Sequence, residues 1–453
     1  MIELPSKLLQ SLANIKGFDL ENFLFAHTQP APVSIRFNQQ KLNDFNLESF
    51  NLPLSTKVPW CKDGFYLTER PKFIFDPAIH AGAYYVQESS SMFLYYLLST
   101  IQVQESGLKV LDLCAAPGGK TTVLASLPQF KMVVANELIK TRVSILYENI
   151  VKWGAPHVLI TNNDPADFTP LKDYFDTILV DAPCSGSGLF RKDPKAIDEW
   201  SENNVKLCAE RQKRILADVL PSLREGGILV YATCSYSSEE NEDIMDWLMQ
   251  HAVFEPVAVE LQDSWNIVET HSDMGGIGYR FFPGKTNGEG FFIACFKLIQ
   301  TQSSAWFPEK KLEIANASEI ALLKEWVNQD GITVIKKNDS LMVLPEIIAP
   351  EIQVLQQFLH LRKSGVLAGT VIRNQFIPEH ELILSNYCRN DLPFFEVDEF
   401  EALQYLRKQE FNRGDFIKGW YVIRYNLLRL GLIKHLGNRI NNYYPASWRI
   451  LKS

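Results

Sequence analysis

The clearest pattern in the chain begins near residue 108, where short apolar runs alternate with longer stretches of helical spacing. The runs are nearly continuous in Val, Ile and Leu, and they cover residues 109–115, 132–136, 157–162, 176–183 and 228–235. Helical stretches lie among them at 138–154 and about 204–223, and the second is expected to stop at Gly226 and Gly227. Apolar strands that alternate with helices predict a mostly parallel α/β sheet with both faces buried. An extended pair, 278–284 and 290–298, is expected to complete this sheet.

The regions on either side of this segment follow other patterns. Residues 8–25 have helical spacing, 31–38 and 60–67 are expected to be short strands, and 83–98 is a candidate helix. Residues 301–306 (TQSSAW) have the composition of a linker. The expected division of the chain is an N-terminal α/β extension (1–105), an α/β domain (106–300), an α+β domain (301–385) and an end domain (386–453).

Composition places the chain among ordinary globular proteins. Hydrophobic residues make up 46% and charged residues 22% of its 453 residues, which excludes a wholly disordered chain. The uncharged stretch 89–104 is broken by Ser, Thr and Gln, so no apolar run approaches the roughly 18 residues of a membrane span, and the N-terminus, with Glu3, lacks the pattern of an export signal. Seven scattered cysteines without a CxxC pair favour a reduced, cytoplasmic protein and argue against a zinc ribbon. We therefore expect no membrane span and no metal.

Charge is distributed unevenly along the chain. The formal net charge is −8, yet residues 418–453 contain seven Lys or Arg and no Asp or Glu. The same stretch is rich in aromatic residues: Trp420, Tyr421, Tyr425, Tyr443, Tyr444 and Trp448. A basic, aromatic end on an acidic protein predicts a local surface for a polyanion, although a small domain that is merely basic would have the same composition.

The first apolar run leads into DLCAAPGGKTT (112–122), at the edge of the sheet where α/β folds bind ligands. Glycines let the backbone approach a ligand closely, and the helix that follows presents free N–H groups. A phosphate-binding P-loop requires Gly where this chain has Cys114, and the dinucleotide fingerprint G-x-G-x-x-G is absent from this loop. A nucleoside-type cofactor without a pyrophosphate remains, and S-adenosylmethionine fits that description.

Two acidic residues follow the next two runs. Glu137 comes nineteen residues after Gly118, where an acid can accept hydrogen bonds from both ribose hydroxyls. The alternative is that Glu137 only caps the next helix. Asp164 follows the third run, and it either holds the adenine amino group or simply begins a turn.

Two cysteines lie at neighbouring strand ends on the same side of the expected sheet. Asp181 and Cys184 follow the fourth run, and Cys234 follows the fifth. A lone cysteine is usually a small buried hydrophobe, but two thiols at the edge of a cofactor cleft, with an acid beside them, favour chemistry. The SSEE segment that comes next, with Glu240 three residues after Ser237, has the pattern of a capping box.

A thiolate beside a methyl donor predicts methylation of an unactivated pyrimidine carbon. C5 of cytosine is too weak a nucleophile alone, but addition of a thiolate at C6 makes an enamine whose C5 can attack the methyl sulfonium. A group near N3 must stabilise the developing charge or donate a proton, and Asp181 is the best-placed candidate, although donation requires a protonated carboxyl. A base then removes the C5 proton and the thiol leaves. A paired target would first have to be flipped out.

Five segments of the chain, in order, closely resemble the Sun-type RNA cytosine-C5 methyltransferases. They are YYVQESSSM (84–92), LDLCAAPGGKTT (111–122), DAPCSGSG (181–188), TCS (233–235) and GYRFFPGKTNGEGFF (278–292). RKDP (191–194) and the end segment GWYVIRYN…LGLIKHLGNRINNYYPASWRI are similar to the bacterial 16S ribosomal-RNA methyltransferase F branch of that family. The resemblance implies a Rossmann-like, S-adenosylmethionine-dependent methyltransferase core, an N-terminal extension that positions RNA, and a PUA-like RNA-binding region at the C-terminus.

The resemblance also implies roles for individual residues. Cys234 would be the nucleophile and Cys184 would assist product release, whereas analogy with DNA cytosine methyltransferases would have chosen Cys184 as the nucleophile. The cofactor would be bound by the loop and three acids: Cys114, Ala115, Ala116, Pro117, Gly118, Gly119, Lys120, Glu137, Asp164 and Asp181. The candidate RNA contacts are Arg191, Lys192, Lys434 and Arg439, with an ordinary solvated charge pair as the alternative for the first two.

Three functions remain open from the sequence. The first is an enzyme that makes 5-methylcytosine in 16S ribosomal RNA of the small subunit, and the second performs the same reaction on transfer RNA. The third is an RNA-binding assembly factor that keeps the fold without turnover; the intact Cys184, Cys234 and Asp181 argue against it. We expect RNA as the partner and a monomeric protein.

Overall fold

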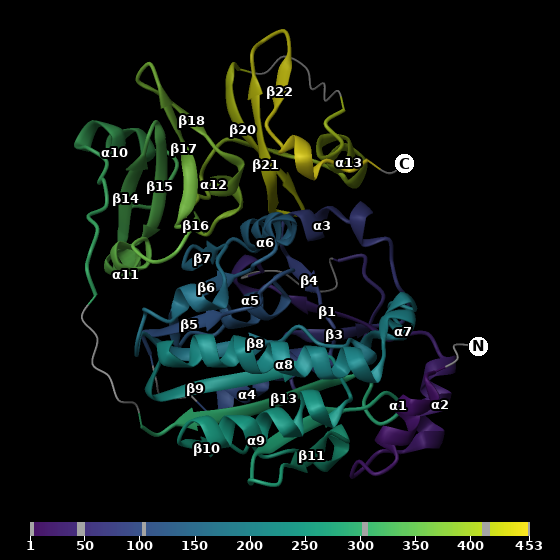
Figure 1. The fold of residues 1–453 in the computed structure, drawn as a ribbon. Coiled ribbons are helices and arrows are strands. Elements are labelled where there is room, and N and C mark those ends of the chain that lie inside the picture. The colour runs from purple at the N-terminus through teal and green to yellow at the C-terminus, as the bar shows by residue number, and fades with distance from the viewer. Residues whose placement is uncertain (1–3, 43–49, 102–105, 301–306, 410–416, 452–453) are drawn as a thin grey trace.

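A computed structural model of the chain describes residues 4–42, 50–101, 106–300, 307–409 and 417–451 (Figure 1). The linker expected at 301–306 lies outside the described residues. Two small sheets from the C-terminal third lie above a large α/β body in this view. None of the helices in the described ranges combines the length and the apolar character that a membrane crossing requires.

The large body is built on one ten-stranded sheet whose centre is parallel. Its strand order is β11-β12-β13-β9-β8-β5-β6-β7-β16, and β10 also pairs with β13. The parallel strands are β5 (Leu108–Asp112), β6 (Phe130–Asn136), β7 (Val158–Thr161), β8 (Phe175–Asp181) and β9 (Leu223–Thr233). The antiparallel side adds β10 (Phe254–Pro256), β11 (Val268–His271), β12 (Ile277–Phe281) and β13 (Phe291–Leu298). The predicted Rossmann-like, mostly parallel core is confirmed.

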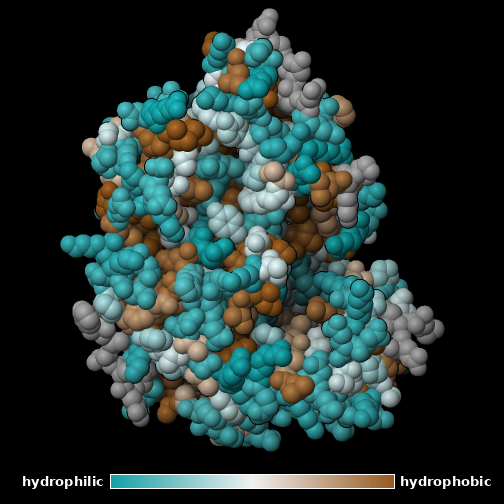
Figure 2. Space-filling view, turned by 45° about the horizontal axis from the view of Figure 1, so that its top comes forward, coloured by the Kyte–Doolittle hydropathy of each residue, from teal (hydrophilic) through white to brown (hydrophobic). Residues whose placement is uncertain are grey.

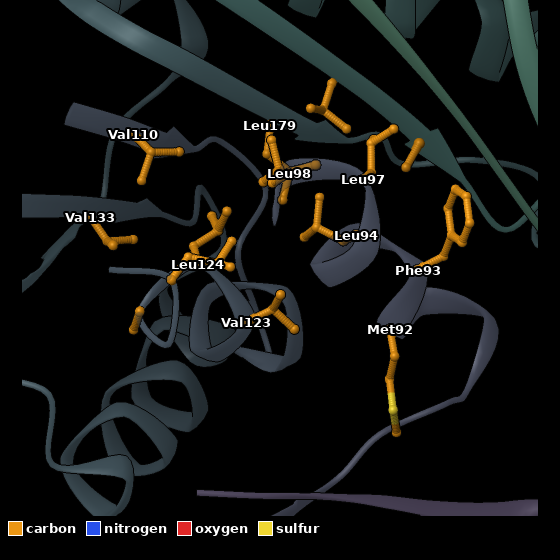
Figure 3. Close-up of a cluster of buried hydrophobic side chains, with 14 of the residues drawn as sticks. Met92, Phe93, Leu94, Leu97, Leu98, Val110, Val123, Leu124, Val133 and Leu179 are labelled. Carbon is orange, nitrogen blue, oxygen red and sulfur yellow. The ribbon is translucent and has the colours of Figure 1, made fainter. Parts of the chain in front are cut away.

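Both faces of this sheet are covered by helices, so alternate residues of each strand are buried on opposite sides. Val133 of β6 belongs to a cluster with α4, α5 and α6, part of which is shown in Figure 3. Val134, the next residue, belongs to a second cluster with α8 and α9. These helices are α4 (Phe93–Ile101), α5 (Gly119–Leu124), α6 (Lys140–Trp153), α8 (Glu202–Val219) and α9 (Glu242–His251). Burial on both faces explains why the strands are apolar throughout.

The long helix ends earlier than expected. α8 stops at Val219, because Pro221 lacks a backbone donor, and a short 3-10 turn (Leu220–Ser222) follows. Gly226 and Gly227 lie inside β9 rather than at the end of the helix. Gly226 has a φ of +73°, and a Cβ on Gly227 would lie 2.7 Å from the carbonyl oxygen of Arg224, so this part of the strand requires glycine.

Two expectations for the N-terminal region also need correction. The helix expected at 8–25 is two helices with a turn between them, where Gly17 has a φ of +75°. The candidate helix at 83–98 starts as a strand that pairs with residues 35–37, and it becomes helical only at Phe93. The elements concerned are α1 (Ser6–Leu12), α2 (Leu20–Thr28) and β4 (Tyr84–Val86). Pairing with a distant strand outweighed the local helical spacing in β4.

The N-terminal region forms a small sheet of order β2-β3-β1-β4 that is attached to the large body through a buried arginine. Its other strands are β1 (Val33–Phe37), β2 (Leu54–Lys57) and β3 (Gly64–Leu67), so β3 covers only the second half of the run expected at 60–67. Arg36 on β1 donates to Gln87 Oε1 (2.9 Å) and to Thr122 Oγ1 of α5 (2.5 Å). Its guanidinium also lies 4.6 Å from the ring centroid of Trp153. Arg36 therefore fixes the small sheet against α5 and the end of α6.

The C-terminal third forms two further four-stranded sheets, of order β14-β15-β17-β18 and β19-β20-β21-β22. The strands of the first are β14 (Ile332–Lys337), β15 (Ser340–Pro345), β17 (Val366–Ile372) and β18 (Gln375–Pro378). Those of the second are β19 (Phe394–Glu396), β20 (Gly419–Tyr425), β21 (Leu428–His435) and β22 (Ile440–Asn442). Between β15 and β17 the chain instead contributes β16 (Leu361–Lys363) to the large sheet, antiparallel to β7. We retain the expected domain division at 300/301 as a proposal. β16 follows this boundary in the sequence but pairs with β7, which precedes it.

Contacts between α6 and the C-terminal third hold the two parts together. The hydroxyl of Tyr147 donates to Glu381 Oε2 (2.6 Å), and the N–H of Asn386 donates to the carbonyl of Gly154 (3.2 Å). Glu381 also forms a buried ion pair with Lys363 of β16 (2.9 Å). On the face shown in Figure 2, hydrophilic residues predominate and hydrophobic ones occur in scattered groups, with a hollow to the right of centre.

Candidate active site

The predicted cofactor loop connects β5 to α5 at the carboxyl edge of the parallel strands. Residues 114–120 make up this loop and the start of α5. The N–H of Ala115 donates to the carbonyl of Asn136 on β6 (2.8 Å), which fixes the loop against the neighbouring strand. Gly118 has a φ of +113°, and a Cβ there would lie 3.2 Å from Leu146 Cδ1. The backbone shape of the loop therefore requires glycine at this position.

Glu137, which follows β6, caps the next turn with one carboxylate oxygen and keeps the other without a hydrogen-bond donor. Its side chain is only 4% exposed. Oε1 accepts from the N–H of Ile139 (2.9 Å) and so caps the turn before α6. Oε2 lies 3.3 Å from Arg142 Nη1, yet within the described part of the chain it has no hydrogen-bond donor. One buried acceptor thus remains for a ligand hydroxyl.

Asp164 begins a turn, as one of its two alternatives predicted. Its Oδ1 accepts from the N–H of Ala166 (3.1 Å), and Asp167 closes the capping box from the other side. The side chain is half-buried. A role for Asp164 toward adenine therefore remains a proposal.

The two cysteines lie together, as their strand ends predicted. Asp181 of β8 is in register with Ala232 of β9, and the loops that follow bring the Sγ atoms of Cys184 and Cys234 to 3.0 Å. The hydrogen bond to Cys234, together with burial, raises the pKa of Cys184 well above its usual range. Cys184 is therefore the thiol of this pair whose protonated form is favoured, and either sulfur can donate the hydrogen bond.

A cation from the cofactor loop joins this pair of strand ends. Lys120 Nζ lies 2.7 Å from Asp181 Oδ2. Burial alone would lower the pKa of Lys120, but the Asp181 carboxylate outweighs burial and raises it. The ammonium group also lies 5.1 Å from the ring centroid of Phe291. Lys120 is thus held as a cation at the edge that carries Cys184 and Cys234.

Glu240 holds the two cysteine loops together, a role that its capping-box pattern did not predict. Ser237 makes no side-chain cap, so the expected capping box does not form. The buried carboxylate instead accepts from the N–H and the hydroxyl of Ser185 (2.8 and 2.5 Å) and from the hydroxyl of Ser235 (2.5 Å). Gln212 Nε2 adds a fourth hydrogen bond (3.1 Å). Because Ser185 follows Cys184 and Ser235 follows Cys234, Glu240 sets the distance between the two loops.

Asp112 is a second acid that the sequence analysis did not select, although it ends β5 and begins the segment that contains the glycine pair. It is completely buried, and its Oδ2 accepts from Thr121 Oγ1 (2.6 Å). Its Oδ1 has no hydrogen-bond partner in the described ranges. Burial, assisted by the charge of Asp181, raises the pKa of Asp112 to about 7. The unpaired oxygens of Asp112 and Glu137 fit a polar cofactor in contact with this loop.

The candidate RNA contacts differ in exposure. Arg191 is nearly buried: Nε pairs with Glu289 (3.1 Å), Nη2 donates to the carbonyl of Gly288 (2.6 Å) and Nη1 to that of Ala26 (3.2 Å). It is therefore not a solvated charge, and three of its N–H groups are already used. Lys192, the next residue, is exposed.

The two candidates in the C-terminal region belong to the last sheet. Lys434 lies on β21, with Nζ 4.7 Å from the ring centroid of Trp420. Arg439 is exposed in the turn before β22, where its carbonyl accepts from the N–H of Leu436 (2.9 Å). Across all the described ranges, no group of three or more His, Cys, Asp or Glu could hold a metal ion.

Asp112→Asn should remove one pH-dependent contribution to stability. Between about pH 4 and pH 7 the folded protein keeps a proton on Asp112 that the unfolded chain has released, so this group lowers the free energy of unfolding as the pH rises. Urea unfolding measures the free energy of unfolding of the wild type minus that of Asp112→Asn. At about 1.4 kcal/mol per pKa unit, this difference should fall by a few kcal/mol over this pH window. Asp263→Asn, at an exposed position, serves as the control, and an equal pH trend in both variants would contradict the assignment.

Glu240→Gln should destabilise the fold, because it places an amide donor where the carboxylate accepts hydrogen bonds. The free energy of unfolding should drop by about 2–4 kcal/mol. Cys184 and Cys234 should also react faster with iodoacetamide, since their loops are no longer tied together. The exposed neighbour provides a matched control: Glu239→Gln should change stability by no more than about 0.5 kcal/mol. Similar effects of the two substitutions would exclude a special role for Glu240.

Comparison with known proteins shows the same relationship along nearly the whole chain. The model described as the N-terminal domain of 16S rRNA methyltransferase RsmF matches residues 4–89, and that of 16S rRNA methyltransferase RsmB/F matches 99–297. The methyltransferase RsmF PUA domain matches 393–450, which confirms the predicted PUA-like region. Ribosomal RNA small subunit methyltransferase F of Shewanella piezotolerans is 30% identical over 448 residues, covering 94% of this chain and 93% of the relative. The Shewanella sediminis protein of the same name is 29% identical, covering 98% and 96%.

Solved structures match the fold of the first two thirds. A methyltransferase homolog protein from Pyrococcus horikoshii is 28% identical with a TM-score of 0.52, and the match covers 65% of this chain and 100% of that one. NSun6 from Pyrococcus horikoshii, solved with SFG, has a TM-score of 0.55 at 21% identity, covering 66% and 99%, and is similar in fold. The resemblance suggested by the five sequence segments is thus confirmed: the chain belongs to the RsmB/F family of 16S rRNA methyltransferases, enzymes that use S-adenosylmethionine.

Proposed function

We propose that the protein methylates C5 of a cytosine in 16S ribosomal RNA through a covalent bond between Cys234 and C6. The thiol pair carries the proposal, because Cys184 and Cys234 lie 3.0 Å apart at the carboxyl edge of the sheet. Methyl transfer to an already nucleophilic atom needs no thiol, whereas C5 of cytosine must first be activated by addition at C6. Relatives named for small-subunit ribosomal RNA support this RNA as the substrate.

S-adenosylmethionine supplies the methyl group as a sulfonium. We assign its binding to the loop of residues 114–120, with the free Oε2 of Glu137 as the acceptor for a ribose hydroxyl. Asp164 is placed at the end of the third parallel strand, where we assign it to the adenine amino group. Asp181, on the fourth, borders both the cofactor loop and the thiol pair through its ion pair with Lys120.

Three steps at the cytosine can be assigned to side chains: attack at C6, stabilisation of the developing charge, and departure of the thiolate. The Cys234 thiolate forms a bond to C6, and the π electrons of the C5–C6 bond make C5 nucleophilic toward the methyl group. Asp181 is the anion of an ion pair, so we assign the donor toward the developing negative charge to Lys120, whose raised pKa keeps it protonated. After methylation a base takes the C5 proton, the double bond re-forms, and Cys234 leaves as a thiolate that the S–H of Cys184 can stabilise.

RNA binding is assigned to surfaces outside this pocket. Three cations are available for phosphate contacts. Lys192 and Arg439 are exposed, and Lys434 is half-buried. We assign Arg191 to ordering the backbone around Gly288 rather than to phosphate, because its donors are engaged within the protein. The aromatic residues of the last sheet, Trp420 among them, offer rings on which bases can stack.

Cys234→Ala and Cys184→Ala should change the amount of covalent RNA adduct in opposite directions. Cys234→Ala removes the nucleophile, so methylation should fall to background and no covalent RNA adduct should form. Cys184→Ala can still attack and methylate but releases the product poorly, so it should accumulate an adduct, visible as a slow band on a denaturing gel. Cys208→Ala, a buried thiol on α8, provides the matched control and should behave like the wild type.

Comparing RNA substrates in the same methylation assay also tests which RNA is the target. Labelled methyl groups should enter small ribosomal subunits or their 16S RNA, and transfer RNA should remain unlabelled. An adduct in Cys234→Ala but not in Cys184→Ala would reverse the two roles. Normal activity in both variants would exclude the covalent route, and preferential labelling of transfer RNA would exclude the ribosomal assignment.

Glu137→Ala should weaken the binding of S-adenosylmethionine without unfolding the protein. The loss of a buried, charged hydrogen-bond acceptor corresponds to about 1.5–3 kcal/mol in binding free energy. Isothermal titration calorimetry on the full chain measures this change directly. Glu210→Ala, whose side chain is 73% exposed on α8, should leave the affinity unaltered. Wild-type affinity in Glu137→Ala would remove Glu137 from the cofactor site.

A further inference from the structure

A large cavity lies outside the cofactor loop and the thiol pair. It is a groove of about 1150 Å³ between α2, the end of β3 and the loop of residues 284–288, and Arg191 and Lys192 complete its wall. Segments that are far apart in the sequence therefore meet around it. None of the residues assigned above to S-adenosylmethionine lines this N-terminal groove.

The lining of the N-terminal groove is basic although the protein is acidic. Arg70, Lys192 and Lys285 contribute cations, and Glu69 is the one acid among the lining residues. The charge of Arg191 is matched by its ion pair with Glu289. A concentration of positive charge in a chain of net charge −8 indicates an anionic partner with repeated charges, since such a groove concentrates polyanions locally.

The wall of the groove also offers an aromatic face. α2 buries Phe23 and Ala26 but leaves the side chain of Phe25 64% exposed where it borders the groove. The side chains of Gln29 and Asn287 line the same space and can donate and accept hydrogen bonds. An exposed ring beside cations and amides is the combination with which proteins bind single-stranded nucleic acid, where bases are free to stack.

A series of hydrogen bonds to backbone carbonyls leads from the groove to the thiol pair. Arg191 Nη2 donates to the carbonyl of Gly288 at the groove wall (2.6 Å). Two residues further on, the N–H of Gly290 donates to the carbonyl of Gly188 (3.2 Å), and the N–H of Gly188 donates to that of Cys234 (2.8 Å). The groove therefore adjoins the segment that carries the nucleophile.

We propose that the N-terminal groove holds the single-stranded RNA next to the target cytosine. Its phosphates pair with Arg70, Lys192 and Lys285, one of its bases stacks on Phe25, and the target base turns from this strand toward Cys234. The inference rests on the proposed function, because it assigns the strand on which that reaction takes place. A paired target region would have to be opened before it could enter the groove.

Binding of short RNAs to the full chain tests this assignment without requiring the reaction. The probe is a fluorescein-labelled, 12-nucleotide oligocytidine RNA, followed by anisotropy in the absence of methyl donor, with a 12-base-pair RNA duplex as the second ligand. Phe25→Ala should weaken binding of the single strand about fivefold or more. The double variant Arg70→Gln/Lys285→Gln should lower the salt dependence of log Kd by about 1.4, at roughly 0.7 per lost cation on single strands. Lys172→Gln/Lys206→Gln makes the same charge change at exposed positions outside the groove and should not alter binding.

The C-terminal region could mask such a loss, so contact is also mapped directly. RNA that carries 4-thiouridine beside the cytosine should crosslink under ultraviolet light to peptides containing Phe25 or Arg70. Crosslinks confined to residues 418–451, or equal affinities in groove and control variants, would overturn the proposal. If Cys184→Ala accumulates the expected adduct while the groove variants bind RNA as tightly as the wild type, only the assignment of the groove is refuted. If the groove variants lose RNA binding but no covalent RNA adduct through Cys234 is detected, only the proposed chemistry is refuted.

Discussion

The arrangement of the active site depends on one buried carboxylate. Glu240 accepts four hydrogen bonds, three of which come from the serines that directly follow the two cysteines. Parallel strands bring the carboxyl ends of β8 and β9 to the same edge, but strand pairing alone does not determine how far apart two flexible loops lie. Burial of a carboxylate is unfavourable unless donors surround it, so the loops are most stable where both serines reach Glu240. The 3.0 Å separation of the thiols is a consequence of that requirement.

Much of this architecture is predictable from the sequence, for a specific physical reason. The parallel strands are buried on both faces, so they appear as continuous apolar runs, and glycines mark the cofactor loop because Gly118 adopts a positive φ. The residues at their carboxyl ends, Glu137 and the two cysteines, follow from position along those runs. Helix boundaries were less predictable: the break at Gly17 and the end of α8 before Pro221 depend on local backbone geometry rather than on apolar periodicity.

The interactions that the sequence did not predict all connect residues distant along the chain. Glu240 fits a local capping pattern, yet it pairs with Ser185, which lies 55 residues away. Arg191 resembles an exposed charge in the RKDP segment, but Glu289, which is 98 residues further on, neutralises it. The apolar pattern of this sequence does not show which of these distant side chains the fold brings together. For the same reason the N-terminal groove, which draws on several separate segments, could not be found before the structure.

The position of β16 has a consequence for the order of biosynthesis. Leu361 to Lys363 form the edge of the sheet beside β7, and the carbonyl of His360 accepts from the N–H of Asn162 at the end of β7 (3.2 Å). A ribosome releases β7 about two hundred residues before it releases its partner. During that interval the nascent sheet has an open edge, with unpaired backbone groups that are prone to intermolecular pairing. The methyltransferase core is therefore completed only after part of the region that follows it in the sequence has emerged.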